Sequence, residues 1–440
     1  MSSLIPISET IISNNTGLDA ITRAPIVDYE TKVRCLRIQN VSHDEPFEMW
    51  GYTEVSEQNY KNFQLQKDDI IISRTGGSIG TLMYIDKDYK SVYNNGLICL
   101  KIDKERYNPR YIYYCLKLDG FKKHIQKCSL GNSTQENIRM NDMLEYMIPD
   151  IKLTIQNQIV EVLKDLDDKI QNNNAINVEL ESMAKTIYDY WFLQFEFPNE
   201  DGKPYKSSGG KMVWNDEIKR EIPEGWEVNN LAKAIFKSKN GDWGNEEPVN
   251  DDDIKVNCFR GADFISITND YQMTAPIRYI KKNNADRLLE DGDLVTEISG
   301  GSPTQATGRI GYINQGFLNR SENVMDCSNF CKAFTPIDRI YQYWLYQTWK
   351  SYYDNGAMFN YESKTTGIKN LMFDDFIDSI YVTYPNEELL EVFQNKCTLF
   401  YEKIQKNLLE NQELASLRDF LLPMLMNGQI SIKRGQKSAN

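Results

Sequence analysis

This 440-residue chain repeats itself, and the repetition constrains its fold more than any other feature of the sequence. When Leu180 is aligned with Leu414, a shift of 234 residues, "ELESM" (179–183) falls on "ELASL" (413–417). A repeat of about half the chain is far longer than a solenoid period, so it indicates two related domains instead of a stack of small units. The length also exceeds what a single hydrophobic core usually serves.

The similarity continues upstream of each of these stretches. "LQKDDIIISRTGGSIG" (65–80) corresponds to "LEDGDLVTEISGGS…GRIG" (289–311), with an insertion before the second "IG". "STQENIRMNDM" (133–143) corresponds to "TGIKNLMFDDF" (366–376). The order along the chain is therefore a globular unit, a long helix, a second globular unit and a second long helix.

Both globular units mix two kinds of pattern. Short runs rich in β-branched residues, such as "DIIIS" and "GLICLKI", alternate with Gly, Asn and Asp turns and predict strands. Late in each unit a capping residue precedes a proline, Asn108-Pro109 in the first and Thr335-Pro336 in the second, which predicts a helix start. We therefore expect the α+β class.

The repeated stretches have the pattern of long amphipathic helices. From Thr154 to about Trp191, apolar residues recur mostly at spacings of three and four, as along the seam of a coiled coil. About 36 residues would make a rod of roughly 55 Å, which needs packing partners to be stable. Each helix could pack on its own globular unit, or the two could pair with each other. Their equal length and shared seam favour antiparallel pairing.

Pairing would place the apolar stripes of both helices at one interface. The two globular units would then lie at opposite ends of the helix pair, as a dumbbell with pseudo-twofold symmetry. Asn173 and Asn407 would lie near the middle, where a buried polar pair can fix the register at some cost in stability. The residues expected to pair are Ile159, Leu166, Ile170, Asn173, Leu180, Met183, Phe393, Phe400, Ile404, Asn407, Leu414 and Leu417.

Composition excludes several classes of protein. With 41% hydrophobic residues the chain is globular, and its net charge of −13 argues against a nonspecific nucleic-acid coat. No apolar run approaches the roughly 20 residues that cross a bilayer, and the N-terminal stretch does not resemble a secretion signal, so we expect a cytoplasmic protein without membrane contact. The eight cysteines are scattered and are expected to be reduced and mostly packed.

The sequence contains no complete match to the catalytic motifs that its residues suggest. "NPRY" at Asn108 to Tyr111 has arginine where an amine-methylating enzyme would have a second proline, and a helix cap explains the asparagine. There is no GxxxxGK[ST] phosphate cradle. His43 and His124 are the only histidines, so a histidine-rich metal site is impossible. We expect no catalytic residue, no metal and no cofactor.

The connector "YWFLQFEFPNEDGKPYKSSGGKMVWNDEIKREIPEGWEV" (190–228), together with "ELESMAKTIYDYWF" and "ELASLRDFLLPMLMNGQI", resembles the specificity subunits of type I restriction-modification systems. The resemblance covers nearly the whole chain. It implies a noncatalytic subunit whose two target-recognition domains each read half of a bipartite site in double-stranded DNA. It also implies that the paired helices set the spacing and dock two adenine-methylating methyltransferase subunits, which restriction subunits can join.

The resemblance assigns a role to each part of the chain. The expected parts are a first target-recognition domain (1–150), a central coiled-coil helix (151–195), a connector (196–222), a second target-recognition domain (223–385), a distal coiled-coil helix (386–428) and a tail (429–440). Gln156 matches the glutamine with which the family often opens its central helix. Leu390 stands opposite Gln156 in the second copy.

Specific reading of DNA requires polar side chains that reach base edges and cations that hold phosphates. The glycine loops and a lysine-rich helix are the candidates, although a structural β-turn and a solvated charged face would explain them too. "FKSKNGDWG" (236–244) adds a third candidate loop. The expected DNA contacts are Arg74, Thr75, Ser78, Lys122, Lys123, Lys127, Lys237, Lys239, Trp243, Thr304, Gln305 and Arg309.

Three other functions fit parts of the sequence. The recognition subunit of a type IIB-like system would share the architecture but assemble with a fused nuclease-methylase. A single-chain enzyme with its own methylase would bind S-adenosylmethionine. A coiled-coil scaffold without DNA function would show no sequence preference at moderate salt.

Overall fold

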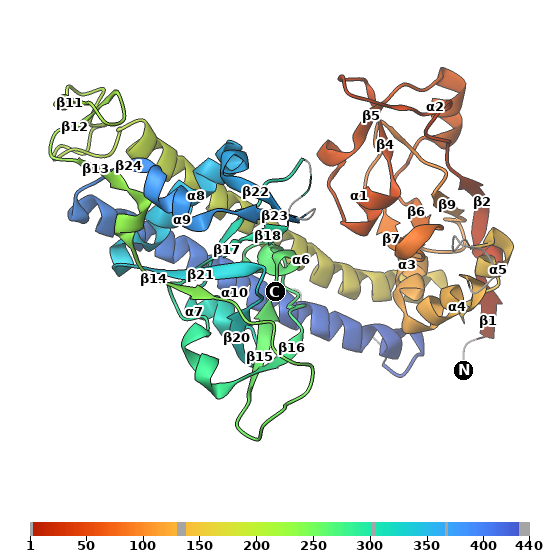
Figure 1. Cartoon of the computed structure of the whole chain (residues 1–440). Helices are drawn as coiled ribbons and strands as arrows, with labels where there is room; N and C mark the ends of the chain where they lie inside the picture. Colours follow the sequence, from red (N-terminus) through yellow and green to blue (C-terminus); the bar gives the residue numbers. More distant parts are fainter. Residues whose placement is uncertain (1–2, 130–137, 301, 303, 366–367, 431–440) are drawn as a thin grey trace, which may run out of the picture. The chain divides into compact units, whose positions relative to one another are not determined.

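The computed structural model describes residues 3–129, 138–300, 302, 304–365 and 368–430. The chain divides into two compact units, residues 1–168 with 415–440 and residues 169–414 (Figure 1). Parts of the aligned motifs (133–137, Gly301 and 366–367) and most of the tail (431–440) lie outside the described residues.

The first unit is built on two four-stranded sheets and a strand pair. One sheet is antiparallel, in the order β2 (Ile11–Thr16), β9 (Leu97–Ile102), β6 (Ile70–Ser73), β7 (Leu82–Tyr84). The other has the order β3 (Ile26–Val27), β5 (Gly51–Thr53), β4 (Val33–Leu36), β8 (Ser91–Tyr93), and β4 and β8 are parallel. β1 (Ser3–Pro6) pairs with β10 (Met147–Asp150). All four residues of β6 are buried, as expected for a strand rich in isoleucine that is covered on both faces.

Five helices complete this unit before the first long helix: α1 (Ile38–Ser42), α2 (Glu57–Phe63), α3 (Pro109–Lys117), α4 (Asp119–Ser129) and α5 (Met140–Leu144). The predicted start of α3 is confirmed. The Asn108 side chain accepts hydrogen bonds from the N–H groups of Arg110 and Tyr111, and Pro109 occupies the first turn.

The second unit repeats the strand order of the first. Its four-stranded antiparallel sheet runs β14 (Ile235–Asn240), β21 (Cys331–Pro336), β17 (Leu294–Glu297), β19 (Ile310–Tyr312). Its second sheet runs β16 (Ile277–Ile280), β15 (Ile254–Phe259), β20 (Val324–Cys327), again with one parallel pair, and β13 (Glu227–Asn230) pairs with β24 (Tyr381–Tyr384). The first strand of each four-stranded sheet has a register shift at the same place, between Ile11 and Ser13 in β2 and between Ile235 and Lys237 in β14.

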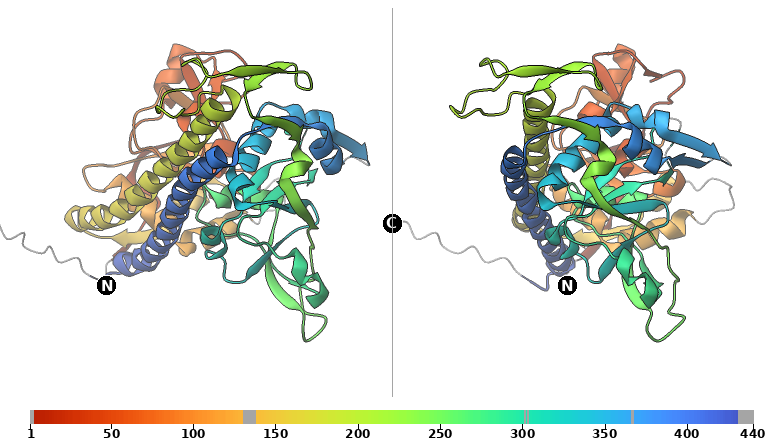
Figure 2. Two further views of the ribbon diagram at one scale, coloured as in Figure 1. Left: turned by 90° about the vertical axis from the view of Figure 1, so that its left-hand side faces the viewer. Right: turned by 60° about the vertical axis from the view of Figure 1, so that its left-hand side comes forward.

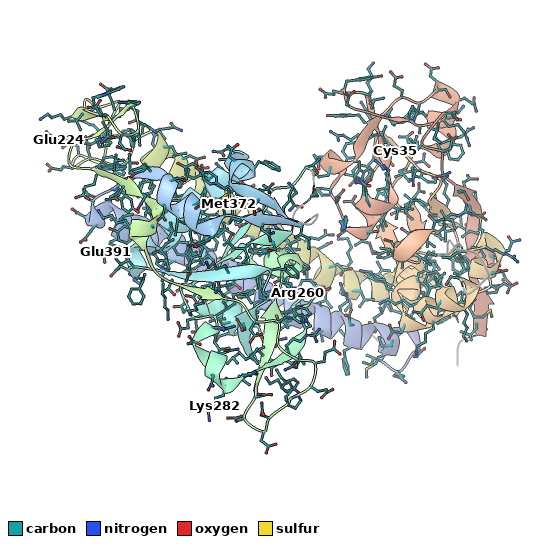
Figure 3. The ribbon with its side chains drawn as sticks, viewed as in Figure 1. Cys35, Glu224, Arg260, Lys282, Met372 and Glu391 are labelled. Atoms are coloured by element: carbon teal, nitrogen blue, oxygen red, sulfur yellow. The ribbon has the colours of Figure 1, made fainter. Side chains whose placement is uncertain are left out.

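Individual hydrogen bonds repeat as well. The N–H of Ile138 donates to the Arg74 carbonyl at 3.0 Å, and the N–H of Leu371 donates to the Ile298 carbonyl at 2.8 Å, which confirms the aligned motifs. The turn after each central strand is also shared. The Arg37 N–H donates to the Asn40 side chain before α1, and the Arg260 N–H donates to the Asp263 side chain before η6 (Gly261–Ile267). Figure 3 labels Arg260 and Cys35, which belong to the equivalent strand ends of the two units.

The prediction that a helix begins at Thr335-Pro336 is wrong. Pro336 is the last residue of β21 and pairs with Ile235. A proline is tolerated at this position because it lies at the end of the strand. The helix begins later: Asp338 caps the short η8 (Arg339–Tyr341), which leads into α8 (Gln342–Asp354).

The second unit also carries elements without a counterpart described in the first. A three-stranded sheet has the order β18 (Ser299–Gly300), β23 (Ile368–Leu371), β22 (Glu362–Thr365). β11 (Met212–Asn215) and β12 (Arg220–Pro223) form a hairpin in the connector. The remaining helices are α7 (Gln315–Leu318), α9 (Phe373–Ser379), and the short 3-10 segments η5 (Leu231–Ala234), η7 (Lys282–Arg287) and η9 (Ala357–Tyr361).

The two long helices are α6 (Leu153–Tyr188), which continues into a π turn at Asp189–Leu193, and α10 (Glu387–Met426). They have 36 and 40 residues, which corresponds to about 54 and 60 Å. Both views of Figure 2 show them side by side. Their contacts run in opposite directions along the chain, so the pairing is antiparallel.

The helices also complete the cores of the two units. In the first unit, Ile159 and Leu163 of α6 join Leu422 and Met426 of α10 in one buried cluster with the strands and α3. In the second unit, the later part of α6 and the earlier part of α10 enclose a core rich in aromatic residues with α8. The two alternatives considered for the helices are therefore combined: they pair with each other, and each half also packs on a domain. The expected fold is confirmed, namely α+β with two related domains joined by long antiparallel helices.

Candidate DNA interface and helix pair

The first glycine loop connects β6 and β7 and is held by backbone hydrogen bonds. The Arg74 N–H donates to the Gly96 carbonyl at 2.9 Å, and the Arg74 guanidinium donates to the Thr16 hydroxyl at 3.3 Å. Gly76 has a φ of 75°, which favours glycine, and added Cβ atoms at Gly76 and Gly77 would meet nothing within 4 Å. The tip of the loop is therefore open to a close approach by a ligand, with Thr75 and Ser78 half-buried beside it.

The second glycine loop connects β17 and β19 at the same position in its sheet. Ser302 and Gln305 form a bridge that closes a turn, and the side chains of Thr304 and Gln305 are exposed. Ser299 and Gly300 at the loop start form β18, which pairs with Asn370 and Lys369 of β23. The loop is therefore supported by a neighbouring hairpin.

Lys369 is a candidate residue that the sequence reasoning missed. Its ammonium lies 3.5 Å from the Gln305 carbonyl and 3.0 Å from the Glu362 carboxylate. The match between "TGIKNLMFDDF" and "STQENIRMNDM" already indicated that this segment belongs to the recognition scaffold. The sequence did not show that the segment turns back as a strand beside the loop.

Arg309 lies at the end of the second loop and is already engaged. Its guanidinium makes a two-point ion pair with Glu297 through Nε and Nη2, both at 3.1 Å. Glu297 is largely buried, so this pair fixes the direction of the arginine side chain. Only Nη1 has no partner in this pair.

The lysine-rich helix α4 presents its cations to solvent. Lys122, Lys123 and Lys127 are exposed, and none has an ion-pair partner among the residues described. Lys123 and Lys127 are one turn apart, so they share a face of the helix. Three unpaired cations on one short helix can hold phosphate oxygens.

In the segment 236–244, two lysines that the sequence treats alike differ in burial. Lys237 is exposed, 3.7 Å from the Glu290 carboxylate. Lys239 is buried, and its ammonium donates to the carboxylates of Asp293 and Glu290, both at 2.8 Å. Burial opposes the charged form, but these carboxylates raise the pKa of Lys239. Because its donors are occupied, the expectation that Lys239 contacts DNA is not compatible with this structure.

The same buried ion pair occurs in the first unit in a different form. Asp69 corresponds to Asp293, but its partner is Lys101 of β9, at 2.8 Å, instead of a lysine on the first strand. Trp243, the third candidate in the segment, is exposed and has the Arg278 guanidinium 4.5 Å from its ring centroid.

The centre of the helix pair is polar. In the second unit the Asn407 amide donates to Asn177 at 2.8 Å, and the Asn173 amide donates to Asn411 at 2.9 Å and to Glu410 at 2.8 Å. Shifting each residue by the 234 positions of the repeat converts one asparagine pair into the other. The asparagines therefore pair crosswise, and Asn173 does not meet Asn407.

Ten of the twelve residues expected at the helix interface are buried or half-buried: Ile159, Leu166, Ile170, Asn173, Leu180, Phe393, Phe400, Ile404, Asn407 and Leu414. The prediction is wrong for Met183 and Leu417, which are 47% and 45% exposed. The helical phase explains this, because a step of four residues from Leu180 leads to Ala184 and Tyr188, and both are buried. Met183 and Leu417 are themselves related by the repeat.

A buried glutamine ties each long helix to the start of a domain helix. The Gln156 side chain accepts the Asn108 N–H at 2.8 Å before α3, and the Gln394 side chain accepts the Tyr343 N–H at 3.1 Å in α8. Leu390, which the alignment places opposite Gln156, has no side-chain oxygen that could accept a hydrogen bond. Gln394 is one turn further along α10, so the second copy makes the equivalent contact from a shifted position.

The residues considered for chemistry have structural surroundings. Asn108 caps α3, His43 follows α1 and is 71% exposed, and the His124 ring on α4 contacts the Asp142 carbonyl. All eight cysteines are free and seven are buried, which confirms their packing. Among the described residues, no group of three or more His, Cys, Asp or Glu side chains is arranged to hold a metal ion. In that same part of the chain, every helix is too short or too polar to span a membrane.

Comparisons with known proteins agree with the repeat and the helix pair. Residues 32–182 match the type I restriction modification DNA specificity domain. The chain is 26% identical to the type I restriction enzyme MjaIX specificity subunit of Methanocaldococcus jannaschii over 345 residues, 76% of this chain and 71% of that protein. It is 23% identical to the type I restriction enzyme HindI specificity subunit of Haemophilus influenzae over 424 residues, 83% and 87% of the two chains.

Among solved structures, the S subunit of the type I restriction-modification system of M. genitalium has a similar fold. Its TM-score is 0.52 at 16% sequence identity, and the match covers 97% of this chain and 96% of that chain. The domain match and the two relatives agree: the chain is similar to the specificity subunits of type I restriction-modification systems, and the M. genitalium S subunit shares its fold.

Proposed function

We propose that this chain reads a bipartite target in double-stranded DNA, one half with each domain, as the noncatalytic subunit of a type I complex. The observation that carries the proposal is the repeated loop. In both domains a glycine-containing loop joins the third and fourth strands of a sheet with the same strand order. Loops on a rigid scaffold are where binding residues concentrate, and a shared scaffold with different loops suits two different half-sites.

The proposed base-reading residues are the polar side chains of these loops. They are Arg74, Thr75 and Ser78 in the first domain, and Thr304, Gln305, Arg309 and Lys369 in the second. The exposed cations Lys122, Lys123, Lys127 and Lys237 would hold phosphates, and Trp243 would add a contact surface beside them. Lys239 leaves the set because it is buried in an ion pair.

We further propose that two methyltransferase subunits dock on the helix pair and that restriction subunits join the assembled complex. Met183 and Leu417 support two such sites. Both are large apolar side chains that face solvent, and the repeat relates them to each other. The two helices also expose Val178, Leu399 and Phe420, and apolar side chains that face solvent at several positions of one surface fit a protein interface.

The alternatives are less well supported. A type IIB-like recognition subunit would share the architecture, but both named relatives belong to type I enzymes. A methylase within this chain would require S-adenosylmethionine binding by the isolated protein, and calorimetric titration with that cofactor tests it directly. Saturable binding would contradict the noncatalytic proposal.

A domain exchange tests the bipartite reading. Residues 229–385 would be replaced by the corresponding segment of a relative, and methylated adenines would be mapped in a host that carries the methyltransferase subunits. We expect one half of the methylated site to change and the other half to stay the same. The matched control is the exchange of residues 1–150, which should change the other half. A change in both halves after either exchange would contradict the proposal.

A further inference from the structure

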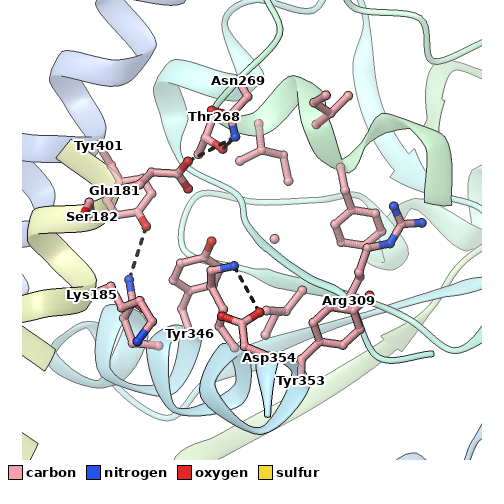
Figure 4. Close-up of a pocket in the computed structure, with 17 residues that line it drawn as sticks. Glu181, Ser182, Lys185, Thr268, Asn269, Arg309, Tyr346, Tyr353, Asp354 and Tyr401 are labelled. Atoms are coloured by element: carbon pink, nitrogen blue, oxygen red, sulfur yellow. Dashed lines mark hydrogen bonds and ion pairs between the residues drawn. The ribbon is translucent and has the colours of Figure 1, made fainter. Parts of the chain in front are cut away.

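A pocket of about 500 Å³ lies within the second unit (Figure 4). Five elements line it: α6, η6, the start of β19, α8 and α10. Pockets of this size accommodate small organic ligands or the side chains of a partner. One proposed base-reading residue, Arg309, lines this pocket, and its guanidinium is held there by Glu297.

The charges around the pocket are paired with one exception. Lys185 is paired with Asp189, Lys350 lies 3.6 Å from Asp354, and Arg309 is held by Glu297. Glu181 reaches in from α6 and has no ion-pair partner among the described residues. The pocket therefore contains one carboxylate whose charge is not neutralised by a specific cation.

The partners of Glu181 are neutral. The Asn269 amide donates to its carboxylate at 3.1 Å, and Figure 4 shows both Asn269 and Thr268 beside it. Burial raises the pKa of Glu181, and Lys350 only partly offsets this effect. A half-buried carboxylate with neutral partners is costly, and a bound cation would lower that cost.

Aromatic rings form much of the wall. Phe264, Tyr346 and Tyr401 are buried beside the pocket, and Tyr353 is half-buried at its side. The faces of aromatic rings attract cations, and the rings also suit an alkyl chain. The combination of one free carboxylate and several rings selects a slim organic cation over an anion.

We propose that this pocket binds an alkylammonium or guanidinium group, with Glu181 as its counter-ion. The same chemistry has two sources: a free polyamine, or a lysine or arginine side chain of a protein that assembles with this chain. The proposal does not depend on the reading of DNA.

The test is calorimetric titration of the full-length chain with spermidine and with agmatine. We expect saturable binding of at least one of them and a loss of tenfold or more in Glu181→Gln. Glu179→Gln, an exposed glutamate two residues away on α6, is the matched control and should bind within twofold of the wild type. Ser182→Trp is a second variant, because an indole at this exposed lining position should block the pocket without disturbing the core.

A second arm distinguishes the two sources. The methyltransferase subunits are co-purified with the wild type, Glu181→Gln and Glu179→Gln. If a partner side chain is the occupant, Glu181→Gln weakens assembly and agmatine competes with the subunits. If a free polyamine is the occupant, assembly is unchanged and the titrations alone respond. The proposal is overturned if Glu181→Gln and Ser182→Trp match the wild type in both arms.

Discussion

Lys237 and Lys239 are two residues apart on β14 and both lie near Glu290, yet Lys237 is exposed and Lys239 is buried. Lys239 is enclosed by the Leu288 carbonyl, Glu290 and Asp293, whereas Lys237 reaches solvent at the edge. Side chains at this spacing leave the same face of a strand, so both lysines were equally good candidates for DNA contacts from the sequence alone. The segment that carries Glu290 covers only one of them, and that is a tertiary contact.

Asp326 on β20 illustrates the cost of a buried charge without a cation. It is fully buried, accepts one hydrogen bond from the Cys327 N–H at 2.7 Å, and its Oδ2 has no hydrogen-bond partner in the described part of the chain. Burial, together with the nearby Asp242 carboxylate, raises the pKa of Asp326 to about 7. In the folded protein the Asp326 side chain therefore stays protonated up to about neutral pH.

This predicts a pH-dependent stability. Because the folded pKa lies above the unfolded value, the protonated group stabilises the fold at low pH, and that contribution is lost as pH rises from about 4 to about 7. Asp326→Asn should remove this pH-dependent loss of stability. At pH 8 the free energy of unfolding of the variant should exceed that of the wild type by up to about 4 kcal/mol. Urea unfolding at pH 5 and pH 8 measures it, with the exposed Asp374→Asn as control. An equal difference at both pH values would contradict the assignment.

Single elements show how the same scaffold carries different functions. α4 follows α3 in the first domain and displays three lysines without ion-pair partners among the described residues, while its inner side packs Phe121 and Ile125 into the core. The helix is therefore anchored by its apolar face, and its cations can be changed without altering the packing.

We expect the lysines of α4 to contribute sequence-independent affinity. Lys122→Gln, Lys123→Gln and Lys127→Gln together should weaken binding to specific and nonspecific DNA by similar factors and lower the salt slope by about 2 to 3. Fluorescence anisotropy at several salt concentrations measures both quantities. Lys61→Gln on the exposed side of α2 is the control. A change confined to the specific site would assign these lysines to base reading instead.

The two asparagine pairs between α6 and α10 also act at the level of single helices. Asn177 and Asn407 are buried, and the Asn407 side-chain oxygen has no partner among the described residues. A buried polar pair costs more when one member is removed than when both are replaced. Such a pair favours one alignment of two helices over its neighbours.

Asn407→Leu alone should therefore lower the free energy of unfolding by about 1–3 kcal/mol, since it leaves the Asn177 oxygen without a donor. The double variant with Asn177→Leu should recover most of that loss. A double-mutant cycle in urea isolates the coupling, and Lys406→Leu on the exposed side is the control. Additive effects of the two substitutions would show that the pair does not act as a unit.

At the scale of the whole molecule, the repeat defines two units whose four-stranded antiparallel sheets have the same strand order, each with half of the helix pair. Both helices are continuous, so their length is a property of the sequence that cannot be changed by repacking. In the proposed function this length sets the unread spacer of the target.

The spacer can be tested by lengthening both helices. Inserting four residues next to Ile170 and next to Leu414 adds about 6 Å and slightly more than one turn, so the apolar stripes stay nearly in phase. The spacer between the methylated half-sites should grow by about one or two base pairs, since the duplex rises about 3.4 Å per pair. Mapping of methylated adenines measures it. The same insertion in the exposed segment 247–250 is the control, and an unchanged spacer in an active complex would refute the ruler.

The features that depend on local sequence pattern could be predicted before the structure was known. The repeat, the α+β class, the cap of α3 at Asn108 and the burial of ten of the twelve residues expected to pair follow from periodicity and turn chemistry, which act over short distances. The match of Ile138 with Leu371 was also visible, because both follow the same local motif. These features do not depend on which distant segments pack against each other.

The other features emerged only from the folded chain, because the burial of a side chain depends on which residues lie opposite it in space. Folding paired Asn173 with Asn411 instead of Asn407, and covered Lys239 with two carboxylates. It also brought Lys369 beside Gln305 and left Glu181 as an unpaired charge among rings. Each outcome requires two segments far apart in the chain to meet, and a single sequence carries no direct record of that meeting.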